Sequence, residues 1–227
     1  MCSSDLGINT NTANIAAIGD VISFYYCGTV SVSNLEIDGN MANADLGGFW
    51  GDTGRQCRGT AIFCFQNKRS FISNVYAHHN CLDGFIIQDL TPNTEDTQAY
   101  MEHCLSEYNA RQGISLLDTR QFTAVNCQFN FSGQATFGSQ PQAGCDIEPS
   151  GSPCTNLSFV NCKFLDNAST GVVCDTQTGQ NFVNFYHCEI VGCDGFSVYV
   201  RSNYFQFNDC RIRGRMAGYS KIGRAHV

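Results

Sequence analysis

The sequence predicts an all-β solenoid, because two short residue patterns recur along most of the chain. In the first, an Asn, His or Asp stands directly before a residue of a type that is usually buried. In the second, a glycine precedes a short alternating apolar stretch, and successive glycines are 23 to 31 residues apart. Left-handed hexapeptide helices need a regular interval of about 18 residues, so we expect a right-handed parallel β-helix of about seven coils.

The first pattern marks a repeated bend between two strands. Apolar residues before and after it are three positions apart, whereas side chains on one face of a straight strand are separated by even numbers. Asn, His and Asp are the non-glycine residues most often found at positive φ, so we expect a one-residue bend there. The residue pairs are Asn34-Leu35, Asn74-Val75, His103-Cys104, Asn126-Cys127, Asn161-Cys162, His187-Cys188 and Asp209-Cys210.

The second pattern places a strand directly after each glycine. Apolar residues occupy the first and third positions after most of these glycines, and polar residues often occupy the second and fourth, which predicts a strand with one face inward. Each coil then holds about three short strands. The glycines are Gly59, Gly84, Gly113, Gly144, Gly171, Gly195 and Gly218.

The chain contains fourteen cysteines, and their spacing favours buried thiols over cross-links. Five of them follow the bend residues and should stack on one inward column, while Cys145 and Cys174 occupy inward positions after a glycine. No Cys-x-x-Cys pair is present, which disfavours a structural zinc site. A free cysteine packs as a small apolar residue, so we expect a reduced cysteine column alongside the asparagine column.

Both ends of the chain depart from the repeat. Residues 1–6 and 221–227, when reverse-translated, resemble short-read sequencing adapters, so we expect them to be artefacts flanking a fragment of a longer protein. Residues 7–220 then form one β-helix domain. In a truncated chain, the absence of a visible signal peptide or anchor carries no information.

Charge narrows the range of partners. The formal net charge is −7 and Lys plus Arg number only 13, which argues against nucleic acid. No stretch is long enough to predict a membrane span. The same charge argues only weakly against an anionic polysaccharide, because a local basic site could still serve one.

Three acidic residues form the main catalytic candidate. Asp146 and Glu148 alternate on one strand, about 7 Å apart, and Asp175 matches Glu148 one coil later. Carboxylates this close repel one another, so at least one pKa should rise and let that group act as a general acid beside an ionised neighbour. Equally, these acids could only solvate a surface or bind calcium. No cofactor is required, calcium is possible, and no residue is assigned as a metal ligand.

Further candidates surround this group. Asp83 and Gln112 each precede a glycine and should be neighbours on successive coils, with Arg111 placed to hold a substrate carboxylate. His78 and His79 lie in the turn before Asp83, where one of them could reach the cluster as a base or ligand, or simply face solvent.

Trp50 lies in the longest insertion of the repeat. An aromatic side chain there could stack on a sugar ring or could instead pin its own loop down.

Three segments of the chain resemble right-handed β-helix proteins of the pectate-lyase-like superfamily. They are Leu82-Asp83-Gly84, Arg111-Gln112-Gly113-Ile114-Ser115 and Gly144-Cys145-Asp146-Ile147-Glu148-Pro149. The resemblance implies a bacterial polysaccharide enzyme or a phage tail spike, with a polysaccharide as partner and an extracellular or virion-surface location. Mannuronan epimerases in this superfamily share the look of residues 82–85, but their Asp-Pro-His-Glu motif is missing, and residues 63–66 occupy the region where it would fall. Paired-Asp polygalacturonase signatures are also absent.

Two functional hypotheses follow. The first is a polysaccharide lyase or glycoside hydrolase that binds a glycan in a groove along the outward face of the glycine-initiated strands. The alternative is a non-catalytic glycan-binding or structural shaft, such as a tail-spike or adhesin segment, present as a monomer or as a side-by-side homotrimer. Fold alone does not choose between them.

Overall fold

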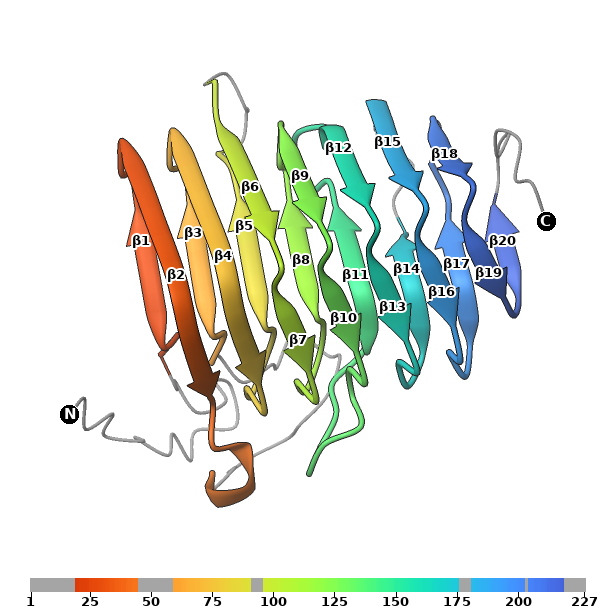
Figure 1. Ribbon diagram of the computed structural model, residues 1–227, viewed down its shortest axis with the longest axis horizontal. Coiled ribbons are helices and arrows are strands. Elements are labelled where there is room, and N and C mark those ends of the chain that lie inside the picture. The colour runs from red at the N-terminus through yellow and green to blue at the C-terminus, as the bar shows by residue number, and fades with distance from the viewer. Residues whose placement is uncertain (1–18, 45–58, 91–95, 176–180, 203, 219–227) are drawn as a thin grey trace.

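Parallel strands stack around one axis in the computed structural model, which describes residues 19–44, 59–90, 96–175, 181–202 and 204–218 (Figure 1). They form an eight-stranded and a twelve-stranded sheet. Each coil supplies one strand to the first sheet and crosses the second as two faces joined at a bend. Seven coils are complete and β20 begins another, which confirms the expected parallel β-helix of about seven coils.

The strands of the eight-stranded sheet are β1 (Ile22–Tyr25), β3 (Ile62–Phe65), β5 (Phe85–Gln88), β8 (Ile114–Leu117), β11 (Ala143–Glu148), β14 (Thr170–Cys174), β17 (Phe196–Val200) and β20 (Met216–Gly218). One face of the twelve-stranded sheet contains β6 (Gln98–Glu102), β9 (Phe122–Val125), β12 (Thr155–Val160), β15 (Asn181–Tyr186) and β18 (Phe205–Asn208). Its other face contains β7 (Leu105–Glu107), β10 (Gln128–Asn130), β13 (Lys163–Leu165), β16 (Glu189–Val191) and β19 (Arg211–Arg213). In the first two coils, β2 (Thr29–Asp38) and β4 (Arg69–His78) run through both faces, and β2 leads to the short helix η1 (Met41–Asn43) (Figure 1).

The predicted bend column is confirmed in all seven coils. Every Asn, His or Asp of the column has φ between 51° and 56°, in the left-handed region. Side chains of the column also contact each other between coils: Asn74 Nδ2 donates to Asn34 Oδ1 at 3.3 Å, and His103 Nε2 lies 3.2 Å from Asn126 Nδ2. The chain therefore bends at the equivalent position in each coil.

A second corner, which the sequence pattern did not indicate, lies directly after β4, β7 and β10. His79, Tyr108 and Phe131 occupy it on successive coils, with φ of 51°, 53° and 54°. Their rings stack, with centroids 5.5 Å apart from His79 to Tyr108 and 4.8 Å apart from Tyr108 to Phe131. Ring stacking offsets part of the cost of placing bulky residues at positive φ.

The glycine column holds in four coils and needs correction in the others. A Cβ at any of the four glycines would lie 2.6–2.8 Å from the carbonyl oxygen of the equivalent residue one coil on, so a side chain there would force the coils apart. These glycines are Gly84, Gly113, Gly144 and Gly171. Gly59, Gly195 and Gly218 lie outside this register, and Ala61 and Ser197 hold the equivalent positions.

Thiols and aromatic rings fill the interior. Every cysteine among the described residues is free, and the column after the bend is buried from Cys104 to Cys188. Cys162 Sγ donates to the Ala124 carbonyl oxygen at 3.5 Å. Burial raises the pKa of Cys145 well above its ordinary value, so this thiol stays protonated. Beside them, the rings of Phe159 and Phe185 stack with centroids 4.7 Å apart.

Among the described residues, no helix has the length and apolar character to cross a lipid bilayer. The two terminal segments expected to be artefacts, residues 1–6 and 221–227, lie outside the described residues, as does Trp50.

The bend column predicts a stability difference at Asn126, whose φ is 55°. Asn126→Val should lower the free energy of unfolding by about 1–2 kcal/mol, because a side chain branched at Cβ is disfavoured in the left-handed region, whereas Asn126→Gly should cost little. Thr123→Val, at an extended position of β9, is the matched control. Urea unfolding measures all three variants, and equal destabilisation by both valine substitutions would contradict the role of the bend.

Candidate functional site

Asp83 is the centre of a buried polar network on the outer side of the eight-stranded sheet. It stands directly before Gly84 in the turn that leads into β5, and its side chain is fully buried. Arg111 donates to both carboxylate oxygens, from Nε at 2.8 Å and from Nη2 at 2.6 Å. The Gln112 N–H and the Ser115 hydroxyl also donate to Asp83, at 3.1 Å and 2.8 Å.

The pairing of Arg111 with Asp83 corrects two sequence-based expectations. Burial alone would lower the pKa of Arg111, but the adjacent Asp83 carboxylate raises it above its ordinary value, so Arg111 keeps its charge. The two donors of Arg111 that face Asp83 form a bidentate pair, so they are not available to a substrate carboxylate. Asp83 is enclosed by four donors, which makes it a positioning group for the turn and not a group that contacts a glycan.

Asp146 joins this network through Gln112, whose Nε2 donates to Asp146 Oδ2 at 2.6 Å. Burial raises the pKa of Asp146 well above its ordinary value, and the charge of Glu148 raises it further, while Arg111 and Gln112 act in the opposite direction. Asp146 and Glu148 lie two residues apart on β11 and therefore share the outward face, as the sequence predicts. Asp146 is only 4% exposed, whereas Glu148 is partly exposed.

Asp175 is held in an ion pair of its own. It follows β14, one coil beyond Glu148, and its carboxylate oxygen lies 2.9 Å from Arg201 Nη1. This exposed ion pair balances the charge of Asp175. The register of Asp146 with Val173 places Asp175 next to Glu148, and Arg201 offsets its charge, so the raised pKa in this group belongs to Asp146.

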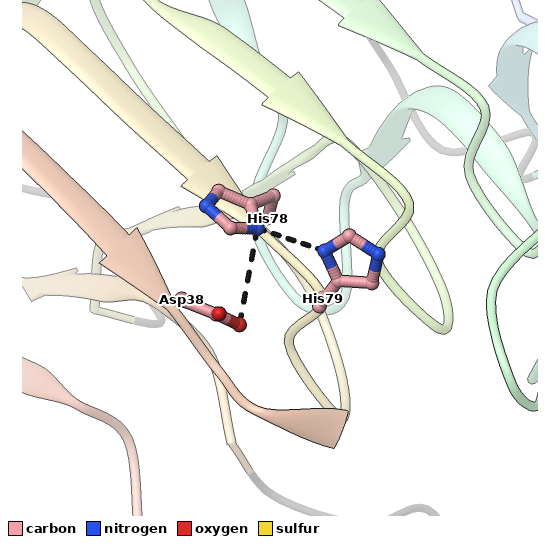
Figure 2. Close-up of side chains that lie close together, drawn as sticks. All are labelled: Asp38, His78 and His79. Carbon is pink, nitrogen blue, oxygen red and sulfur yellow. Dashed lines mark hydrogen bonds and ion pairs between the residues drawn. The ribbon is translucent and has the colours of Figure 1, made fainter. Parts of the chain in front are cut away.

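His78 and His79 face acidic residues of β2 instead of the Asp146 network. His78 Nε2 lies 3.2 Å from Glu36 Oε1, and its Nδ1 lies 2.8 Å from His79 Nδ1 and 3.8 Å from Asp38 Oδ1. Figure 2 shows the two imidazole rings and the Asp38 carboxylate directed toward one another. The register explains this arrangement, since Asp38 on β2 pairs with His78 on β4.

An aromatic patch covers the outward face of β1 and β3. Tyr25, Tyr26, Phe63 and Phe65 form this patch, with ring centroids 5.3 to 6.1 Å apart. Tyr25 and Tyr26 are exposed, and both phenylalanines are partly exposed. In the sequence, Phe63 and Phe65 drew notice only because residues 63–66 occupy the region of a motif that is missing. Their spacing of two residues in a strand was the signal that could have predicted a shared outward face.

Two adjoining surface hollows lie elsewhere, over the first strands of the twelve-stranded sheet. The larger, of about 440 Å³, is lined by Gly28, Thr29, Lys68, Arg69, Asp96 and Gln98. The smaller, of about 330 Å³, shares Gln98 and adds Phe71, Tyr100 and Gln121. Together they combine cations, amides and an exposed aromatic ring, which the sequence analysis did not identify.

The raised pKa of Asp146 predicts a pH-dependent stability difference. The folded protein holds this proton more tightly than the unfolded chain, so wild-type stability falls as pH rises from about 3.9 toward the raised folded pKa, and the loss is complete above it. Asp146→Asn removes the titration and keeps an oxygen for Gln112. Its stability relative to wild type should therefore increase over this pH interval, which urea unfolding at several pH values measures; a difference independent of pH would contradict the prediction.

Comparisons with known proteins identify the fold. No family model matches the chain, and no curated protein matches it in sequence. The A-module of the mannuronan C-5 epimerase AlgE4 from Azotobacter vinelandii is similar in structure, with a TM-score of 0.53 and 19% sequence identity. The match covers 83% of this chain and 53% of that one, so this chain spans about half its length. This likeness shows that the chain folds as a right-handed parallel β-helix.

Proposed function

We propose that the protein binds a polysaccharide on the outward face of the eight-stranded sheet and acts on it by acid–base chemistry. The carrying observation is the pair on β11, in which Asp146 has a raised pKa beside the carboxyl group of Glu148. A carboxyl group that keeps its proton next to an ionised one is the arrangement that general acid–base catalysis uses. Glu148, the more exposed of the two, contacts the glycan, and Asp146 holds a proton behind it.

The charge balance of the network favours a neutral glycan. Asp83 and Arg111 cancel each other, and a protonated Asp146 leaves Glu148 as the remaining charge. A site with net negative charge disfavours anionic sugars by simple repulsion. The bidentate pairing of Arg111 with Asp83 also favours a neutral glycan, because Asp83 already balances the charge of this cation.

The aromatic patch supplies a binding platform on the same face. Strand register places Phe65, Gln88, Leu117 and Glu148 in one row across β3, β5, β8 and β11. Three strand spacings of about 4.8 Å separate Phe65 from Glu148, a length that a short oligosaccharide lying along the helix axis can span. The apolar faces of its sugar rings would stack on Tyr25 and Phe65.

The structural neighbour supports a glycan partner in general, since its name describes action on mannuronan. An acid–base step needs no cofactor, and a polysaccharide substrate favours an extracellular or virion-surface location. Monomer and homotrimer both stay predictions.

Glu148→Gln should reduce kcat on the glycan substrate by about 10²–10⁴-fold, with little change in KM, because the substitution removes a proton-transfer group but keeps its shape. Reducing ends and unsaturated-uronate absorbance, measured on neutral and anionic polysaccharides, report hydrolysis and lysis. Glu189→Gln, on β16 of another face, is the matched control. Undiminished turnover by Glu148→Gln would remove the β11 pair from the mechanism.

A second candidate function, non-catalytic binding of an anionic glycan, is favoured by the two hollows. Lys68 and Arg69 are exposed at one end, and Phe71 is 44% exposed at the other. A cation beside an exposed ring suits an acidic sugar, because the cation attracts the sugar's carboxylate while the aromatic ring stacks on the sugar ring.

Phe71→Ala and Lys68→Gln should each weaken binding of an anionic polysaccharide by about threefold to tenfold, equivalent to about 0.5–1.5 kcal/mol. The loss in Lys68→Gln should shrink at high salt, because ions screen exposed charges. Affinity electrophoresis measures the effect, with Arg213→Gln on β19 as the control. Unaltered mobility in both variants would exclude the hollows as a binding site.

A further inference from the structure

We propose that Asp38, His78 and His79 form a binding site for a transition-metal dication of the Zn²⁺ class. One ligand atom from each residue lies within 4.8 Å of the others. This site is distinct from the β11 pair and does not depend on the proposed function.

The separations between the donor atoms suit one small ion. Zn²⁺ binds imidazole nitrogen and carboxylate oxygen at about 2.0–2.2 Å, so two ligands of a tetrahedral ion lie about 3.3 Å apart. The distance from His78 Nδ1 to His79 Nδ1 is 2.8 Å and that to Asp38 Oδ1 is 3.8 Å, values on either side of this separation. Small rotations of the exposed Asp38 and the half-buried His79 equalise them.

Backbone conformation makes the two adjacent histidines converge. Consecutive residues of a straight strand point to opposite faces, so His78 and His79 could not share a ligand there. His79 is in the left-handed region, with φ of 51°, and this bend brings its ring beside that of His78 (Figure 2). Asp38 then approaches from the neighbouring coil through its register with His78.

Neighbouring side chains hold the ligands in the orientation that a metal needs. Glu36 Oε1 lies 3.2 Å from His78 Nε2, so in neutral His78 the Nε2–H donates to Glu36 and the Nδ1 lone pair faces the site. This carboxylate–imidazole contact is the usual support of a metal-bound histidine. The Tyr76 ring packs on His78 at 4.3 Å, and the Tyr108 ring stacks on His79 at 5.5 Å.

The donor set selects the kind of ion. Two imidazoles and one carboxylate suit Zn²⁺ and neighbouring transition metals, whereas Ca²⁺ prefers oxygen ligands alone. Three protein ligands also leave a fourth tetrahedral position for water or another ligand. Asp38 and His79 reach solvent, so an ion can enter from outside.

Isothermal titration with ZnCl₂ tests this site on the whole chain, after native-state alkylation of accessible thiols such as Cys27, Cys193 and Cys210. One Zn²⁺ should bind per chain, and Ca²⁺ should neither bind there nor compete. His79→Ala and Asp38→Asn should each weaken Zn²⁺ binding at least tenfold, and Glu36→Gln should weaken it by about 10–100-fold. The control His187→Ala, an exposed histidine whose Nδ1 lies 4.0 Å from Asp209, should bind as wild type does.

Electronic absorption of the Co²⁺-substituted protein gives an independent readout. Histidine and carboxylate ligands should produce visible d–d bands without the near-ultraviolet charge-transfer band of a thiolate ligand. A dominant thiolate band would overturn the site, as would absence of saturable binding or full affinity in His79→Ala and Asp38→Asn. An equal loss in His187→Ala would show nonspecific binding and also overturn it. Circular dichroism confirms that each variant is folded.

Discussion

The rest of this structure depends on one constraint, a residue in the left-handed region of φ at the equivalent position of each coil. In the bend column this residue is always Asn, His or Asp, with φ near 50–56°. It lets two straight strands meet at an angle without a longer turn. Because every coil bends at the same position, the strands on each side stay in parallel register, and equivalent side chains fall into rows along the axis.

These rows decide where polar groups meet. Asp83 and Arg111 are adjacent because their turns occupy equivalent positions on successive coils, and the close packing at Gly84 and Gly113 keeps these turns near one another. A buried ion pair of this kind costs desolvation energy that only good geometry and further donors offset. Gln112 and Ser115 are such donors, so the network fixes the chain at the point where Asp146 joins it.

The sequence was informative wherever a residue type is tied to a backbone conformation. The bend column was visible because Asn, His and Asp tolerate positive φ, and the outward placement of Asp146 and Glu148 followed from strand alternation. The second corner could not be predicted from the sequence, because Tyr and Phe are unusual at positive φ. Stacking of the Tyr108 and Phe131 rings stabilises them there. The glycine column misled at both ends, where Ala61 and Ser197 occupy the equivalent positions and the nearby glycines lie out of register.

Side-chain pairing could not be predicted in the same way. The sequence shows that Arg111 and Asp83 are near each other, but not that two guanidinium nitrogens face the carboxylate. The approach of Asp38 to His78 needs the strand register between coils, which an irregular repeat length conceals.

The column of buried thiols has a consequence for how unfolding of this solenoid can be followed. Each cysteine of the described column sits in a different coil, and none is cross-linked. The buried thiols of this column, from Cys104 to Cys188, become reactive only when their own coils open, so alkylation rates would record local opening one coil at a time along the axis. The interior thus carries a natural series of chemical reporters, from which the spread of cooperativity through the solenoid can be measured.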